Sequence, residues 1–335
     1  MSEQLPLPAP AVDGPAQHPI RLVVTDDLQR SRLTVFFRLL LAIPHFVWLV
    51  LWGIAVWFAV LGAWVVLRLT MRTLIPFLAL TFGLTWGLAA LAILFTDQIT
   101  ALFGEIGLSN PLVILAVYAP GIAGVLLVWW HYALRGLGSF FRRLTLWRMP
   151  LGWWLFLLLG IPAVFFAGAA IKGTLDTAFP FPSWAEAVPA LALALFLGPI
   201  EEFGWRGVAL PLLQRRYAPF WAALILGILW AVWHIPSFLI SGMPQTAWSA
   251  GPYFLGIITL SVILTPMFNA SRGSLLIAVL YHFQMMNPLW PDAQPYDSFI
   301  LIGVAALVVW LNRRNMFRSE GAVTGVLMPA ETGSV

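Results

Sequence analysis

Long apolar runs separated by short polar loops dominate the hydrophobic pattern of the chain. Several runs reach the roughly 20 residues that a helix needs to cross a bilayer. We expect eight core spans near residues 74–95, 109–131, 152–171, 185–214, 220–240, 252–269, 273–289 and 298–314. A lipid-crossing backbone must satisfy its own hydrogen bonds, and the alternating pattern of membrane barrel strands is missing from the sequence. The pattern therefore predicts an all-α, polytopic transmembrane helical bundle.

A further apolar stretch, residues 36–67, precedes these spans and has arginines on both flanks. Basic flanks favour the cytoplasm, so a single crossing would place one of them on the wrong side. We expect an N-terminal membrane hairpin or re-entrant element here, with one long tilted helix as the alternative. The residues before it are rich in Pro and Ala and contain no long apolar core, so we predict no cleavable signal peptide.

These patterns predict four parts. They are a disordered cytoplasmic tail at 1–20, an accessory N-terminal membrane hairpin at 21–72, a helical core at 73–315 and a disordered C-terminal tail at 316–335. Arginine-rich loops alternate with acidic loops along the core. Arginine bias assigns to the cytoplasmic side the loops that hold Arg135, Arg142, Arg143 and Arg148, Arg215 and Arg216, Arg272, and Arg313, Arg314 and Arg318. Both termini are therefore predicted to be cytoplasmic, and the style of the chain suggests a bacterial cytoplasmic membrane.

Composition supports the membrane interpretation, since 61% of residues are hydrophobic and only 10% are charged. An ordinary soluble domain has roughly 25% charged residues. The formal charge of +4 comes mainly from arginines beside apolar runs, so it indicates membrane topology, and no nucleic-acid partner is expected. Cysteine is absent, which excludes disulfides, thiolate ligands and thiol catalysis.

Few ionisable side chains remain inside the predicted spans once their ends are removed. They are Glu201, Glu202, Arg206, His234 and His282. A charge at the bilayer centre costs about 2.5 to 3.5 kcal/mol even on a lenient scale, so it needs a partner or a wet cavity. A helical rise of about 1.5 Å per residue places both histidines and Glu201 at similar depth. Three separate spans thus indicate one buried polar site.

Glu202 and Arg206 are four residues apart, so a helix places them on one face as an ion pair. Glu201 then points about 100° away, which leaves it available as a general base. Pro199 lacks a backbone donor and can bend the helix just upstream. The alternative is that 185–214 forms two shorter pieces with the glutamates in an interfacial turn, and that the histidines only pack between helices.

Three short motifs resemble those of the CPBP family, which includes CAAX prenyl endopeptidases and Abi-type bacteriocin-processing enzymes. Residues 201–206 follow its EExxxR pattern. Trp230 precedes His234 as the aromatic residue of the second motif, and His282 is followed by Asn287 as in the third. The core spans also agree in number with those of the family.

This resemblance implies an intramembrane protease that uses a glutamate to activate water. Glu201 would be the base, supported by Glu202 and Arg206. His234 and His282 would orient the water, stabilise the oxyanion or bind a metal, and Asn287 would help to hold the oxyanion. The cofactor stays open, because Glu201 and the two histidines can form a zinc site with an open position, yet the same groups can activate water without a metal.

One departure concerns Asn287, which follows His282 by five residues where the family usually has four. A regular helix would turn the amide about 140° from the imidazole instead of about 40°. Met286 occupies the usual place and cannot donate a hydrogen bond. Pro288 disfavours helix at Asn287, so a distorted helix end can still swing the amide inward.

The leading hypothesis is an endopeptidase acting on a membrane-embedded or lipid-proximal peptide, with the lipid bilayer as its solvent. A non-catalytic membrane scaffold or bacteriocin-immunity factor is the first alternative, and the altered third motif favours it. A proton-coupled transporter is the second, since intramembrane Glu and His also build proton relays. The sequence predicts no particular oligomer.

Overall fold

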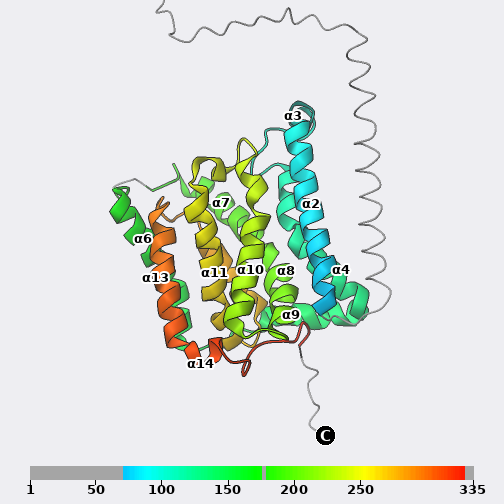
Figure 1. Cartoon of the computed structure of the whole chain (residues 1–335). Helices are drawn as coiled ribbons and strands as arrows, with labels where there is room; N and C mark the ends of the chain where they lie inside the picture. The colour runs from blue at the N-terminus through cyan, green and yellow to red at the C-terminus, as the bar shows by residue number, and fades with distance from the viewer. Residues whose placement is uncertain (1–70, 176–178, 329–335) are drawn as a thin grey trace, which may run out of the picture. The chain divides into compact units, whose positions relative to one another are not determined.

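The computed structural model describes residues 71–175 and 179–328, and within these residues the regular structure is entirely helical. Figure 1 shows the main helices as a bundle. They are α2 (Leu74–Leu94), α3 (Thr96–Phe103), α4 (Pro111–Phe141), α5 (Leu151–Leu155), α6 (Ile161–Lys172), α7 (Trp184–Phe196), α8 (Glu202–Gly204), α9 (Leu210–Gln214), α10 (Pro219–Trp233), α11 (Ala250–Ala270), α12 (Leu275–Met285), α13 (Tyr296–Leu311) and α14 (Arg313–Met316). The prediction of an all-α, polytopic bundle is confirmed.

Each of the eight expected core spans is helical in the structure. Six are long and apolar enough to cross a membrane: residues 71–94, 111–145, 151–172, 184–214, 219–238 and 250–270. The other two, α12 and α13, are apolar but shorter, with 11 and 16 residues. The chain is therefore an integral membrane protein. The predicted hairpin and the first tail fall, but for residues 71 and 72, outside the described residues.

The span that carries the EExxxR motif is not one regular helix. After α7 ends, a 3₁₀ turn (η4, Gly198–Glu201) begins with Pro199 in its first turn, and α8 adds three residues. A π-helical turn (η5, Trp205–Ala209) then leads into α9, where Pro211 stands in the first turn. Neither proline has the backbone N–H that a continuous α-helix would use. The backbone hydrogen bonds therefore change here from α-helical to 3₁₀ and π-helical spacing.

Two glycines of α4 allow the segment from η4 to α9, which carries the EExxxR motif and which we call the motif segment, to pack against that helix. A Cβ atom on Gly121 would lie 2.6 Å from the carbonyl oxygen of Ile200, and one on Gly124 would lie 2.8 Å from that of Phe203. Both distances are far below an ordinary contact, so only glycine fits.

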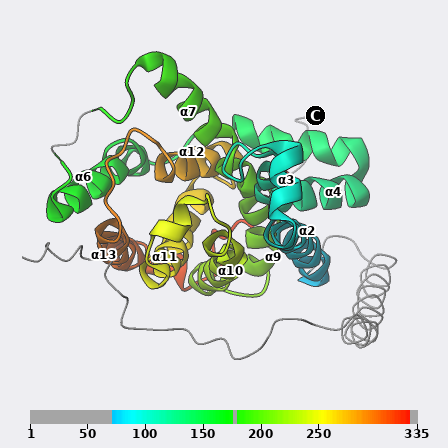
Figure 2. The same ribbon diagram turned by 90° about the horizontal axis from the view of Figure 1, so that it is seen from above.

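Figure 2 shows α12 near the middle of the bundle, between α7 and α11. The motif segment and α12 are thus held next to each other.

The chain after α14 also packs against the bundle, which differs from the disordered tail expected from residue 316. Met316 and Val326 are fully buried. Gln214 Nε2 donates to the carbonyl of Val323 at 2.9 Å, and Arg215 Nε donates to that of Thr324 at 2.9 Å. Polar side chains at the helix ends need acceptors, and the backbone of residues 322–328 supplies them. The expectation was therefore wrong for residues 316–328.

Candidate active site

Glu202 lies at the centre of a buried ionic cluster. One of its oxygens, Oε1, accepts hydrogen bonds from Arg206 Nη1 at 3.0 Å and from His282 Nδ1 at 2.8 Å. Glu202 and Arg206 are completely inaccessible to solvent. The ion pair that the sequence predicts is present, and it also reaches α12. A carboxylate that accepts from an arginine and an imidazole keeps both donors oriented.

Arg206 is held by an aromatic ring as well as by Glu202. Its guanidinium carbon lies 4.5 Å from the centroid of the Trp230 ring. A cation over the face of an indole is attracted by the ring quadrupole, and burial strengthens this attraction. Arg206 thus fixes both the carboxylate of Glu202 and the indole of Trp230.

Glu201 points away from this cluster, as its place next to Glu202 predicts. Its Oε2 accepts a hydrogen bond from Trp230 Nε1 at 2.9 Å. The side chain is 3% exposed and lines a cavity, whereas Glu202 and Arg206 do not. The two adjacent glutamates therefore separate into one that faces the cavity and one that stands behind it.

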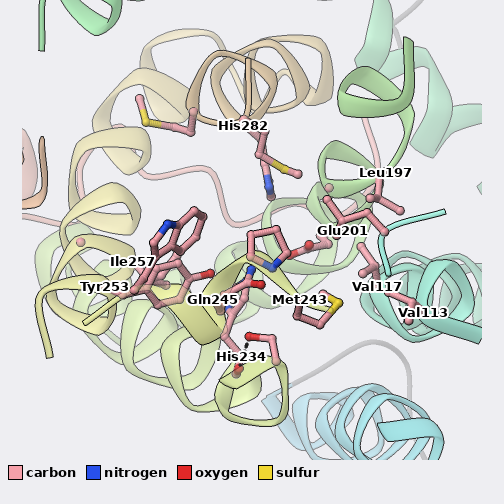
Figure 3. Close-up of a pocket in the computed structure, with 18 of the residues that line it drawn as sticks. Val113, Val117, Leu197, Glu201, His234, Met243, Gln245, Tyr253, Ile257 and His282 are labelled. Carbon is pink, nitrogen blue, oxygen red and sulfur yellow. Dashed lines mark hydrogen bonds between the residues drawn. The ribbon is translucent and has the colours of Figure 1, made fainter. Parts of the chain in front are cut away.

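The two histidines each use Nδ1 for a structural hydrogen bond. His282 donates to Glu202, and His234 donates to the carbonyl of Trp230 at 2.8 Å. Both rings line the cavity of Glu201, as Figure 3 shows. A Cβ atom on Gly198 would lie 2.8 Å from His282 Nε2, so this nitrogen is approached closely by bare backbone. Each imidazole is thus oriented through one nitrogen, which leaves Nε2 for chemistry.

The cavity has a volume of about 500 Å³ and is mostly apolar. Part of the lining is a surface that we call the apolar wall, formed by α2, α3, α4, the connection between α3 and α4, and the segment after α10. Its members are Ala89, Ala92, Ile99, Ile106, Val113, Ile240 and Met243. A few polar groups within a largely apolar cavity are typical of a binding site for a mostly apolar ligand.

Asn287 also lines the cavity, but its amide is engaged within its own turn. The helix α12 ends at Met285, so Asn287 lies beyond the helix, as Pro288 predicts. Its Nδ2 donates to Gln284 Oε1 at 3.3 Å, and its Oδ1 accepts from the Leu289 N–H at 3.0 Å. Met286 instead approaches Gly198, where a Cβ atom would meet its sulfur at 2.1 Å. The structure therefore brings Asn287 to the cavity without aiming its donor at His282.

The proposed metal ligands do not form a ready metal site. Within residues 71–175 and 179–328, no group of three or more His, Asp or Glu side chains is placed to hold a metal ion. His282 and His234 direct Nδ1 to Glu202 and to a backbone carbonyl, and Glu201 binds the Trp230 indole. Glu201, His234 and His282 are therefore not gathered into a preformed metal site among the described residues, although bonds through Nδ1 leave Nε2 of each ring available to a ligand.

Residues that sequence reasoning did not assign to the site also contribute to it. Trp230 was noted only as an aromatic residue, yet its N–H is the hydrogen-bond donor to Glu201. Tyr253 of α11 lines the cavity with its ring centroid 5.6 Å from that of His234. Gly198 makes room for His282. The choice of tryptophan, the aromatic residue with an N–H donor, was the available signal for Trp230, whereas nothing local in the sequence distinguishes Tyr253.

The part of the chain that contains these glutamates and histidines is similar to known proteins. The profile of the type II CAAX prenyl endopeptidase Rce1-like family matches residues 182–286. The chain is 30% identical over 184 residues to CAAX prenyl protease 2 of Methanococcus maripaludis, covering 52% of this chain and 66% of that protein. The chain thus spans just under two thirds of that relative's length. The family match contains the glutamates and both histidines and ends one residue before Asn287.

Proposed function

We propose that the chain, which is similar to CAAX prenyl endopeptidases over this region, is an intramembrane endopeptidase in which Glu201 activates water. The observation that carries this proposal is the separation of roles between the two glutamates. Glu201 faces the cavity, while Glu202 stands behind it and holds His282 at 2.8 Å. A base beside an oriented imidazole is an arrangement that suits hydrolysis.

In the proposed reaction, Glu201 takes a proton from a water molecule, and the resulting hydroxide attacks the carbonyl carbon of the scissile peptide bond. The carbonyl oxygen becomes an oxyanion. In this scheme His282 carries a proton on both nitrogens throughout, so its Nε2–H donates to the oxyanion, while Glu202 at Nδ1 balances the positive charge of the ring. His234 orients the water. Collapse of the intermediate restores the carbonyl and breaks the C–N bond, and the proton on Glu201 passes to the leaving nitrogen.

The proposed substrate is a membrane-embedded or lipid-proximal peptide. The relative from Methanococcus maripaludis is named for CAAX prenyl substrates, and the apolar wall of this chain suits an apolar portion of such a ligand. A peptide lying along this wall brings its backbone past Glu201. We also propose, from the arginine bias of the loops, that both termini lie in the cytoplasm.

Replacing Glu201 with glutamine tests the proposed base. We expect Glu201→Gln to lower the cleavage rate of membrane-associated peptides at least 100-fold, because general base catalysis contributes roughly 10²- to 10⁴-fold. The assay uses purified protein in liposomes, with thermal unfolding as a measure of folding. Glu186→Gln is the matched control, since Glu186 is exposed near the start of the same span. Full turnover by the Glu201→Gln protein would remove Glu201 from the mechanism.

A non-catalytic membrane scaffold is the second candidate, and the position of Asn287 favours it. The amide expected to hold an oxyanion is bonded within its own turn, to Gln284 and Leu289. The peptidase assay distinguishes the two candidates, because a scaffold predicts no cleavage by the unmodified protein and no effect of Glu201→Gln.

A further inference from the structure

Arg143 is a buried arginine outside the cavity that bonds to three separate segments of the chain. Only 2% of its surface is exposed. Its Nε donates to the carbonyl of Gly273 at 2.8 Å, and its Nη1 donates to those of Gly207 at 2.9 Å and Val326 at 2.8 Å. Its Nη2 approaches the carbonyl of Arg206 at 3.4 Å. The arginine-rich loop therefore contains one residue that acts inside the fold and not only as a topology signal.

Two of these carbonyls, those of Arg206 at the end of the EExxxR motif and of Gly207 just after it, are the oxygens that an N–H at position 211 would reach. An α-helical bond from position 211 would reach Gly207, and a π-helical bond would reach Arg206. Proline has no N–H, so neither bond can form. Arg143 donates to both of these oxygens. Its guanidinium thus replaces the N–H that Pro211 removes, at the turn that follows Glu202.

The third carbonyl, that of Gly273, lies in the turn that begins α12. Gly273 has a positive φ of 80°, and Ser274 follows as the N-cap of α12, its Oγ accepting from the Ile277 N–H at 3.0 Å. His282 is about two helical turns further along this helix. Arg143 therefore joins the start of the helix that carries His282 to the turn that carries Arg206.

Aromatic packing leaves the Arg143 side chain little freedom to move. Its guanidinium carbon lies 5.6 Å from the ring centroid of Phe140 and 5.5 Å from that of Phe268. A Cβ atom on Gly207 would lie 2.7 Å from the Phe140 ring, so the motif turn is pressed against the same aromatic group. A planar guanidinium between two rings presents its donors in fixed directions.

We propose that Arg143 is a positioning residue that keeps Glu202 and His282 in hydrogen-bond register across their two segments. This inference rests on the proposed peptidase function, since it assigns to Arg143 the alignment of that site. Lysine in its place keeps the charge, but its three donors radiate from one nitrogen and cannot reproduce the wide, planar fork that reaches carbonyls of three segments. The effect reaches the reacting groups only through Glu202 and His282.

The first test compares Arg143→Lys with Arg148→Lys, an exposed arginine of the same loop. We expect Arg143→Lys to lower kcat about tenfold with KM nearly unchanged, as for losses of groups that orient catalytic residues. Arg148→Lys should match the unmodified protein. A purely structural role predicts instead less folded protein with the same KM and kcat per folded molecule, and that result would overturn the proposal.

The second test restores the missing donor. Pro211→Ala supplies an N–H at position 211, so in the Arg143→Lys protein it should recover the part of kcat that depends on the turn after Glu202, but not the part that depends on α12. Absence of recovery would overturn the proposed link to Pro211. Should Arg143→Lys fail to fold, the double variant decides, because recovered folded and active protein supports the proposal and a second failure contradicts it.

Hydrogen exchange provides a readout that does not depend on peptidase activity. Arg143→Lys should raise amide exchange in residues 202–210 and in α12, and Pro211→Ala should reverse only the rise in residues 202–210. Faster exchange confined to the C-terminal segment would show that Arg143 only anchors that segment and would overturn the proposal. If the unmodified protein cleaves no peptide, the proposed function fails while this measurement still tests the positioning role.

Discussion

Trp230 links more parts of the site than any other side chain described above. Its N–H bonds to Glu201, its face carries Arg206, and its ring centroid lies 5.4 Å from that of His282. Phenylalanine would keep most of these ring contacts but could not donate a hydrogen bond. Removing only the indole N–H therefore tests the positioning of Glu201 while the packing of the site stays nearly the same.

We expect Trp230→Phe to lower kcat by roughly 10- to 100-fold with little change in KM or in the thermal unfolding midpoint. A hydrogen bond to a charged group contributes about 1.5 to 3 kcal/mol, and each 1.4 kcal/mol corresponds to about tenfold in rate. Steady-state kinetics in liposomes measure the effect. Trp310→Phe is the control, because Trp310 is 60% exposed on α13. Equal kinetics of the two variants would show that the bond to Glu201 has no role in turnover.

At the scale of elements, the site depends on how closely α4 approaches the motif segment. Gly121 and Gly124 face the backbone that leads through Glu201 and Glu202. Small residues at helix contacts in membranes allow backbones to approach closely. The same helix also carries Gly138, whose added Cβ would have no neighbour within 4 Å. Helix α4 therefore contains one glycine in close contact with the motif segment, Gly124, and one with free space around it, Gly138.

Gly124→Ala should destabilise the protein by about 1 to 3 kcal/mol, as overpacking of a close contact typically does. The added methyl group would lie 2.9 Å from Gly204 Cα, and backbone cannot rotate away as a side chain can. Thermal unfolding in detergent measures the effect, with Gly138→Ala as the control. An unchanged midpoint for Gly124→Ala would mean that the two segments are less tightly packed than the structure indicates.

The elements and the main polar groups could be predicted from sequence because both are local patterns. Apolar runs locate the eight core spans, and the four-residue spacing of Glu202 and Arg206 predicts their ion pair. The bond between Trp230 and Glu201 depends on how α10 packs against η4, which no local pattern encodes. Arg143 was interpreted as a topology signal for the same reason, since its acceptors lie more than 60 residues away in sequence.

For the described molecule as a whole, the C-terminal segment closes one end of the bundle. Residues 322–328 provide acceptors for Gln214, Arg215 and Arg143, and Ser139 Oγ donates to the carbonyl of Met328 at 3.3 Å. A buried donor that loses its acceptor costs about 1 to 3 kcal/mol. The segment is therefore expected to stabilise helices that lie far apart in sequence.

Ending the chain after Met316 should lower the thermal unfolding midpoint, whereas ending it after Met328 should not. The first truncation removes the carbonyls of Val323 and Val326, which are one acceptor each of Gln214 and Arg143, and the second leaves them in place. Unfolding of both proteins in the same detergent measures the difference. Equal midpoints would show that water or lipid replaces these bonds without loss.

The unequal lining of the cavity also decides where solvent can stay inside it. Hydrocarbon that settles on the apolar wall displaces poorly bound water, while the carboxylate of Glu201 and the free nitrogens of the two imidazoles still offer hydrogen bonds to water. Water is thereby favoured on the side of the cavity that carries the proposed base, Glu201. For the proposed function this means that an apolar peptide occupying the cavity would still meet a hydrated carboxylate.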